Sequence, residues 1–270
     1  MDATPPDPET AAGLLAAFTE RIRLADRDVA PGHVVEHVDG VLRTYPADPR
    51  EPGAMIESPL GLGDHPDATI ARHRDFFVER GQSVEWKTYT HDQPVDLGQR
   101  LSAAGFTRGE DEALMLGELE RLVGPVDVPQ GITVRVLEVD EPLERITALT
   151  DVVWGADTRW VAERLADERR RKPEEIEIVV AQEGDVGAFL CAGWVRFSPG
   201  TDFAGMWGGH THPDHRRRGL YRATLARRAT LALERGHRYA RVDASPASEP
   251  ILTALGLMRV GTTIPFVLEP

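Results

Sequence analysis

In the second half of the chain, stretches with helical periodicity alternate with short apolar runs. Apolar residues that recur every three or four positions predict helices over 143–153, 160–170 and 223–235. Short apolar runs between turn residues predict strands over 176–182, 189–197, 203–209, 239–244 and 263–268. The first two strands flank Glu183-Gly184-Asp185, which is typical of a hairpin turn. With a strand after Gly131 and a short helix over 250–257, the order is strand, two helices, three strands, helix, strand, helix, strand.

A basic loop, His212 to Arg222, joins the run 203–209 to the helix predicted over 223–235. The start of a helix leaves backbone N–H groups unpaired and carries a partial positive charge. A glycine in such a turn, here Gly219, lets the backbone approach a ligand closely. The arginines add charge and forked donors that suit phosphate. The loop therefore predicts an anion site of the kind that holds a pyrophosphate.

This loop resembles the acyl-CoA loop of the GNAT superfamily of N-acyltransferases. The family pattern is Gln/Arg-x-x-Gly-x-Gly/Ala, often after a proline, and Pro213, Arg216 and Gly219 match it, whereas Tyr221 departs at the last position. The element order over 131–270 fits the family as well. The resemblance implies acetyl-CoA or another acyl-CoA as cosubstrate. It places the cofactor on Thr211, Arg216, Arg217, Arg218, Gly219, Leu220, Tyr221, Arg222 and Ser245.

An internal repeat extends the resemblance to the first half. Ala68-Thr69-Ile70-Ala71-Arg72 recurs as Ala223-Thr224-Leu225-Ala226-Arg227, at a constant offset of 155 residues. We therefore expect an α/β chain of two tandem GNAT-like domains, each a mixed, mostly antiparallel sheet flanked by helices. Residues 124–131 have linker composition, which puts the domains at 1–126 and 127–270. Gly61-Leu62-Gly63-Asp64 stands where the second half has its arginines, so the first domain is expected to be degenerate.

The catalytic groups that the family usually has are not in their usual positions in this sequence. By resemblance, an amine attacks the thioester directly, a base removes a proton from the amine, and an acid or water protonates the thiolate. Leu252 stands where the family has its tyrosine acid, and the fourth strand has no carboxylate after Asp202. His210 and Asp243 are the candidate catalytic residues, although a structural histidine is the alternative for His210. Strand alternation would put His210 and Thr211 on opposite faces.

Composition narrows the partners. The chain has 270 residues and a net charge of −13; residues 1–130 hold 24 acidic and 12 basic residues, against 20 and 19 in the remainder. An acidic protein is a poor general binder of nucleic acid, so none is expected as a partner. Cys191 is the single cysteine, no apolar run is long enough for a membrane span, and the start lacks signal-peptide features. These points favour the cytoplasm.

The aromatic and histidine residues leave alternatives open. His210, His212 and His215 have a spacing that can bind zinc, but the adjacent arginines disfavour a dication, so no metal site is expected. Trp154 and Trp160 flank the junction of the first two helices of this half, where relatives often contact their acceptors; core packing is the alternative.

The leading hypothesis is an acetyl-CoA-dependent N-acyltransferase that acetylates a small-molecule amine by direct attack. One alternative in the same class is a tandem enzyme similar to mycothiol synthase, which also pairs a degenerate and an active half. The alternative from another class is a non-catalytic acyl-CoA-binding or sensing module, because the tyrosine acid is absent at Leu252. Acceptor, acyl group and oligomeric state are left open by the sequence.

Overall fold

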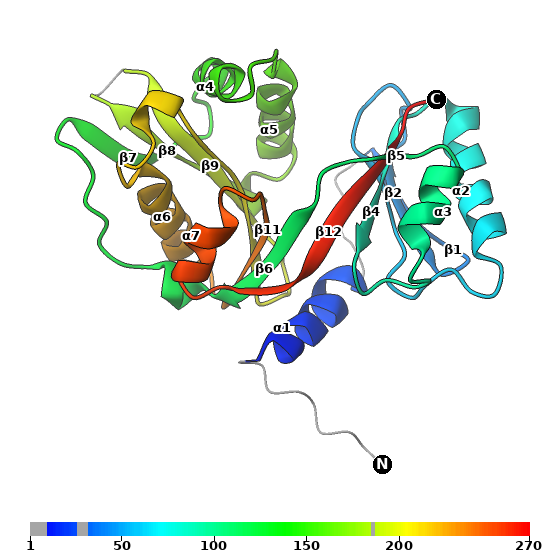
Figure 1. Ribbon diagram of the computed structural model, residues 1–270. Helices are drawn as coiled ribbons and strands as arrows, with labels where there is room; N and C mark the ends of the chain where they lie inside the picture. The colour runs from blue at the N-terminus through cyan, green and yellow to red at the C-terminus, as the bar shows by residue number, and fades with distance from the viewer. Residues whose placement is uncertain (1–9, 26–31, 185–186) are drawn as a thin grey trace. The chain divides into compact units, whose positions relative to one another are not determined.

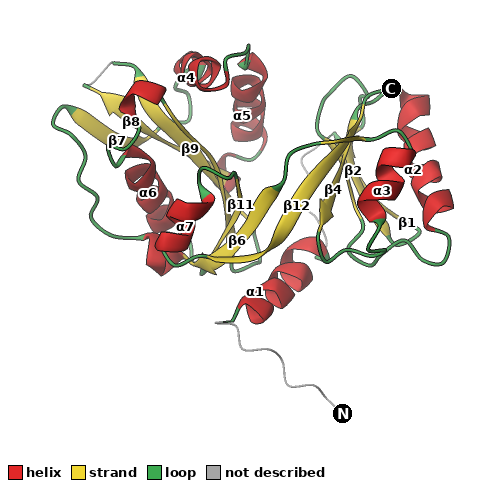
Figure 2. Ribbon diagram, in the orientation of Figure 1, coloured by secondary structure: helices red, strands yellow, loops and turns green. Residues whose placement is uncertain are grey.

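The computed structural model describes residues 10–25, 32–184 and 187–270. The chain divides into two compact units, which we call the first unit (residues 1–115, 243–251 and 259–270) and the second unit (residues 116–242 and 252–258). Figure 1 shows the elements of both units along the chain, and Figure 2 shows which are helices and which are strands. Asp185, in the expected hairpin turn, lies outside the described residues.

The first unit combines an antiparallel meander with a parallel crossover. Its strands are β1 (His33–Val38), β2 (Val41–Pro46), β3 (Ala54–Glu57), β4 (Val84–Tyr89), β5 (Thr107–Arg108) and nearly all of β12 (Met258–Leu268). β1, β2 and β3 pair antiparallel in sequence, β3 and β4 pair parallel, and β12 pairs antiparallel with both β4 and β5. Its helices are α1 (Ala11–Phe18), the π-helical turn η1 (Thr19–Arg23), α2 (Pro66–Arg80) and α3 (Leu97–Ala103).

Helix α2 illustrates how local sequence sets the elements of the first unit. A proline at its first position suits the unpaired helix start, and Gly81 ends it in the left-handed conformation at φ 58°. Its buried face, with Ile70 and Phe77, packs in one core with Trp86 of β4 and Phe266 of β12. Burial of this apolar surface is what holds the helix on the sheet.

The second unit contains most of the elements predicted for the second half of the chain, except the last strand and the start of the short helix before it. Its helices are α4 (Glu144–Trp154), α5 (Arg159–Arg171) and α6 (Leu220–Glu234), with 3-10 turns η2 (Leu119–Leu122), η3 (Pro173–Glu175) and η4 (Pro213–His215). Its strands include β7 (Ile132–Val136), β8 (Ile176–Glu183), β9 (Phe189–Phe197), β10 (Phe203–Thr211) and most of β11 (Tyr239–Ala244). β7 to β10 pair antiparallel in sequence, and β10 pairs parallel with β11. Two further elements, β6 (Glu112–Glu118) and α7 (Glu249–Ala254), are divided between the units.

The two faces of the second unit's sheet are covered by different helices. Ile178 and Ala192 belong to the core that α4 and α5 form with β8 and β9. Ala181 and Cys191, which point to the other face, pack with Leu220 of α6. The face to which a strand residue points therefore decides whether it packs against α4 and α5 or against α6.

The fold class predicted from sequence is confirmed, with one change in strand assignment. The helices expected at 143–153, 160–170 and 223–235 are present within a few residues. The last strand begins earlier than expected, at Met258, and pairs with β4 and β5 in the first unit. Pairing partners depend on long-range contacts that a local apolar pattern does not encode. The domain boundary at 126/127 stays a prediction.

No helix among the described residues combines the length and apolar character needed to cross a bilayer.

Candidate functional site

Strand β10 leaves its parallel partner before either strand ends. Its register with β11 covers Phe203 to Gly205, opposite Tyr239 to Arg241. On its other side β10 stays paired with β9 as far as Thr211. Among the described residues, β10 therefore has an edge, from Met206 to Thr211, with no register partner on β11.

A β-bulge interrupts this unpaired segment. The register with β9 shifts between Gly208 and His210, so Gly209 has no opposite residue. Gly208 and Gly209 both have positive φ angles, 73° and 83°, which side chains rarely tolerate. A bulge removes backbone groups from the ladder and re-aims them, and bulges are common beside functional sites.

Beyond β10, the loop and the start of α6 form a concave, amide-rich turn. Arg217 and Gly219 both adopt left-handed backbone angles, at φ 61° and 80°. The first amide that bonds back into the helix is that of Ala223, which donates to Gly219 O over 2.9 Å. The amides of Leu220, Tyr221 and Arg222 precede it, in the first turn, where helices leave donors unpaired.

Arg216, Arg217, Arg218 and Arg222, which we call the loop arginines, are all exposed. No ion pair joins any of them to a carboxylate within the described part of the chain. Arg216 Nε donates to Thr211 O over 3.4 Å, and Arg218 Nη1 lies 2.7 Å from His215 Nδ1. Four cations at the positive end of a helix repel one another and the helix dipole, so the arrangement favours a bound anion.

Other exposed arginines of the second unit are paired. Arg159 lies 2.7 Å from Asp157, Arg238 lies 3.0 Å from Glu118, and Arg170 contacts Asp167. The acidic surface of this chain thus offers partners for arginines outside the loop. The unpaired state of the loop arginines is a local property of this turn.

Gly219 is required by the protein itself. A Cβ at this position would lie 2.8 Å from Asp127 O, so the segment before β7 occupies the space that the missing side chain leaves. From the sequence, we expected the missing side chain to let a ligand approach the backbone; in the structure, Asp127 O occupies this space. Substitution of Gly219 would strain the turn whether or not an anion binds there.

His210 and Thr211 point to opposite faces of the sheet, as strand alternation predicts. Thr211 lies opposite Cys191, and its Oγ1 donates to Cys191 Sγ over 3.3 Å on the α6 face. His210 lies opposite Ala192, on the face that α4 and α5 cover. The imidazole therefore faces the junction of α4 and α5.

His210 sits in an aromatic environment. Its ring centroid lies 5.2 Å from that of Trp154 and 5.8 Å from that of Trp194. Burial, and next the charge of Arg228, lower the pKa of His210 from 6.5 to about 4. Its Nδ1 is buried without a hydrogen-bond partner among the described residues. The imidazole is therefore neutral at physiological pH, with a nitrogen lone pair available in one tautomer.

The α4–α5 junction presents two partly exposed indoles beside His210. Trp154 and Trp160 are 47% and 51% exposed, and their ring centroids are 5.7 Å apart. Asp151 fixes the junction, because its Oδ1 accepts hydrogen bonds from both N and Oγ1 of Thr158, each over 2.7 Å. Half of each indole surface is available to a ligand, so core packing does not account fully for these residues.

Leu220 and Tyr221 have packing roles at the start of α6. Leu220 is 1% exposed and belongs to the core with Cys191. The Tyr221 ring lies so close to Gly209 that a Cβ there would be 2.6 Å from Tyr221 Cε2. Burial raises the pKa of the Tyr221 hydroxyl. The side chain of Tyr221 therefore supports the bulge.

The remaining sequence candidates, Asp243 and Ser245, belong to the first unit. Asp243 Oδ2 accepts from Lys87 Nζ over 2.7 Å, and both side chains are buried. Ser245 is exposed, and its Oγ lies 3.2 Å from Ser248 Oγ. The second unit therefore brings together His210, Thr211 and the basic loop, whereas Asp243 is held in an ion pair with Lys87. Roles for Asp243 and Ser245 at the site stay predictions.

Sequence reasoning missed Arg228, whose guanidinium is 1% exposed beneath the bulge. The sequence did contain a signal for its burial, because Arg228 stands four residues after Thr224 and so lies on the apolar face of α6. Its neighbour Arg227 shows the ordinary pattern, with a partly exposed side chain 3.9 Å from Glu234. An arginine on the apolar face of a helix is expected to be buried, and a buried arginine usually has a specific hydrogen-bonding role.

Several solved structures share this fold. The GCN5-related N-acetyltransferase from Kribbella flavida aligns with a TM-score of 0.64 at 16% identity, over 95% of each chain. A tandem GNAT protein from the clavulanic acid biosynthesis pathway aligns at 0.61 and 14% identity, over 99% of this chain and 97% of its own. The GCN5-related N-acetyltransferase from Sphaerobacter thermophilus aligns at 0.62 and 14%, over 99% and 94%. No protein-family model and no curated protein sequence matches the chain.

The chain has a tandem GNAT fold. The two GNAT halves differ at the helix that follows their loop. α2, the counterpart of α6, begins after Asp64 and His65 and carries Asp67 in its first turn, where it lies 2.7 Å from Arg100. α6 begins after three arginines and has no acid in its first turn. The start of α6 is therefore better suited to an anion than the start of α2.

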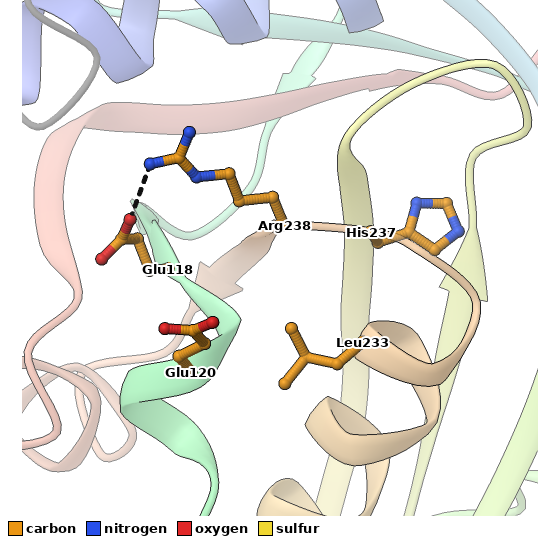
Figure 3. A pocket seen from close by; sticks show the side chains of 5 residues that line it. All are labelled: Glu118, Glu120, Leu233, His237 and Arg238. Carbon is orange, nitrogen blue, oxygen red and sulfur yellow. Dashed lines mark hydrogen bonds and ion pairs between the residues drawn. The ribbon is translucent and has the colours of Figure 1, made fainter.

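The second unit also has a cavity that is separate from this site. It is lined by Glu118, Glu120, Leu233, His237 and Arg238, near the C-terminal end of α6 (Figure 3). The fifteen residues of α6 span about 22 Å, so the cavity is far from the basic loop. The His237 ring turns away from the two carboxylates and stacks on Phe197 at 5.6 Å. We assign this cavity no part in the site.

Proposed function

We propose that this protein is an N-acyltransferase that transfers an acetyl group from acetyl-CoA, or another acyl group from its CoA ester, to a small-molecule amine. One observation carries the proposal: the four loop arginines at the start of α6 form no ion pair with a carboxylate of the described residues, in a chain with a net charge of −13. A GNAT fold with this loop suits the pyrophosphate of CoA. The absence of a membrane-length helix among the described residues is compatible with the cytoplasmic location that we expect.

The basic loop would hold the cofactor through backbone and side chains together. The first-turn amides of Leu220, Tyr221 and Arg222 would donate to the pyrophosphate, as helix starts do for anions. The guanidinium groups of Arg216 to Arg218 would neutralise its charge. The edge of β10 next to Thr211 would receive the pantetheine arm through backbone hydrogen bonds.

The reaction needs few protein groups. The amine nitrogen attacks the thioester carbonyl carbon, a C–N bond forms, and the C–S bond breaks as the electron pair leaves on sulfur. Backbone donors at the bulge of β10 would stabilise the oxyanion of the tetrahedral intermediate. His210 would accept the proton that the amine loses. Water would protonate the thiolate, because Leu252 is fully buried and carries no proton to give.

The acceptor would approach from the α4–α5 face. Trp154 and Trp160 offer two half-exposed indole surfaces on the face to which His210 points. Indole faces attract both apolar bodies and ammonium groups. The acceptor would thus be bound by its body against the indoles, with its nitrogen directed to the thioester.

A panel of amines assayed with acetyl-CoA, following release of free thiol, tests this function. We expect turnover with at least one small amine and its loss in the double variant Arg216→Gln/Arg217→Gln. The double variant Arg159→Gln/Arg170→Gln, which removes two paired arginines of the same unit, is the matched control and should keep full activity. Failure of every amine, together with no CoA binding by calorimetry, would contradict the proposal.

A non-catalytic acyl-CoA sensor is the second candidate, favoured by the buried leucine at position 252 and by the low pKa of His210. A sensor would bind acetyl-CoA tightly and release no thiol with any amine. A tandem acetyltransferase similar to mycothiol synthase would differ only in its acceptor, which the same panel would reveal.

A further inference from the structure

Arg228 is a buried cation held by main-chain carbonyl groups. Its Nη1 donates to Trp207 O over 2.9 Å and to Trp194 O over 3.4 Å, and its Nε donates to Thr224 O over 3.1 Å. No carboxylate forms an ion pair with it in the described part of the chain, and its Nη2 has no hydrogen-bond partner there. The guanidinium thus joins α6 to β9 and β10 at one point.

That point is the start of the bulge in β10. Trp207 immediately precedes Gly208 and Gly209, where the register with β9 shifts. Trp207 C=O and Gly208 N–H belong to one trans peptide unit, so they point in opposite directions. By binding the carbonyl, Arg228 fixes the direction of the Gly208 N–H, away from α6.

The surroundings are shaped around the guanidinium. A Cβ at Gly193, opposite Gly208 in the register, would lie 2.7 Å from Arg228 Cζ and 2.8 Å from its Nη1. Gly193 has no left-handed backbone angle that would by itself require glycine. Room for Arg228 is the reason that this position carries no side chain.

Stability alone does not explain such a residue. Burial of a cation has a large desolvation cost, and even buried ion pairs can often be replaced by apolar residues with no loss of stability. The same helix position could carry a methionine or leucine and still pack against the sheet. The desolvation cost of Arg228 therefore indicates that this residue has a function at the β10 bulge, whose first carbonyl it binds.

We propose that Arg228 is a positioning residue: it holds the Trp207 carbonyl and thereby aims the bulge amides of β10 at the acyl carbonyl of the bound thioester. The inference rests on the proposed acyltransfer for its catalytic part. Its structural part, control of the bulge by Arg228, stands apart from that function. The two parts are tested by different measurements.

Amide hydrogen exchange tests the structural part. In Arg228→Met, which keeps most of the side-chain length and removes the donors, residues 207–210 should exchange at least about tenfold faster than in the wild type. Residues 189–192 of β9 should keep their protection. Arg228→Lys, which retains one donor and the charge, should restore part of the protection. Arg227→Met on the exposed side of α6 is the matched control and should leave exchange unchanged.

Steady-state kinetics test the catalytic part. Arg228→Met should lower kcat at least about tenfold, since the lost donors act on the transition state, while KM for acetyl-CoA changes less than about twofold. Arg228→Lys should recover part of kcat. Gly193→Ala should also lower kcat by displacing the guanidinium, and should add little in the Arg228→Met background.

The exchange and kinetic measurements distinguish failure of this inference from failure of the proposed function. Faster exchange confined to 207–210 supports control of the bulge even if no amine is ever acetylated, in which case only the proposed function fails. Unchanged exchange in folded Arg228→Met overturns the inference, and so does exchange that rises evenly across the second unit. Equal kcat in Arg228→Met and the wild type would overturn the catalytic part.

Discussion

At the scale of single residues, His210 combines two properties that oppose each other. Burial and Arg228 keep its imidazole neutral, because they lower its pKa to about 4. A neutral imidazole can accept a proton, but one with this pKa holds it weakly. His210 would therefore suit an amine that arrives already deprotonated. The proton that it accepts after the attack would then pass quickly to water.

His210→Gln should lower kcat at least about 100-fold if the imidazole takes the proton, and should leave CoA affinity intact. In the wild type, the rate should hold as pH falls through 6.5 and decline only near pH 4, where His210 becomes protonated. The measurement is a pH–rate profile with a weakly basic amine, whose own titration stays outside the range. A decline centred near 6.5, or an unchanged profile in His210→Gln, would contradict the role.

Leu252 belongs to the core rather than to the chemistry. It is fully buried, so Leu252→Ala should lower the free energy of unfolding by about 2–5 kcal/mol, as large-to-small core changes do. Urea denaturation would measure this. Ile251, its neighbour in α7, is 36% exposed, and Ile251→Ala should cost much less. A loss of turnover in Leu252→Ala without loss of stability would argue against a core role.

At the scale of elements, sequence periodicity predicted what is local and missed what is not. The helix α6 and the hairpin partners β8 and β9 follow from apolar spacing and turn residues, which act within a few positions. The partner of β12, the approach of Asp127 to Gly219 and the burial of Arg228 depend on segments far apart in sequence. The basic loop was recognisable because its charge and glycine are adjacent.

Under the proposed function, the loop and the start of α6 bind the pyrophosphate of CoA together, so substitution of either loop arginine should weaken CoA binding. Arg216→Gln and Arg217→Gln should each weaken CoA binding about tenfold or more, in line with hydrogen bonds to charged groups. Calorimetry at two salt concentrations would measure the affinity for CoA, which should depend less on salt in the variants than in the wild type. Arg159→Gln, which removes an arginine paired with Asp157, should bind CoA as the wild type does. Equal affinity in all three variants would move the cofactor elsewhere.

At the scale of the whole molecule, buried neutral histidines make stability depend on pH. Burial, and then Arg43, lower the pKa of His73 in the first unit to about 4, as happens for His210 in the second. Between pH 6.5 and 4 the unfolded chain binds these protons and the folded chain does not. Acid therefore favours unfolding over this window, and the stability is regained as pH rises through 6.5.

For His73, which is fully buried, the loss between pH 7 and pH 5 should be about 2 kcal/mol. Urea denaturation at both pH values would measure it. His73→Phe should reduce the pH dependence by that amount. Equal pH dependence in wild type and His73→Phe would show that His73 titrates normally.

The two GNAT halves share the order of three strands, helix, strand, helix and strand. Their electrostatics differ, so the molecule should bind one CoA per chain. The start of α6 offers unpaired arginines, whereas the start of α2 carries Asp64 and Asp67, and the surrounding residues 1–130 hold twice as many acidic as basic residues. Phosphate is repelled from such a surface. Calorimetric titration should give a stoichiometry of one. The double variant Arg216→Gln/Arg217→Gln should weaken that single event, and Asp64→Asn/Asp67→Asn should leave it in place. Two binding events of similar affinity would show that the first half also binds CoA, and would contradict this prediction.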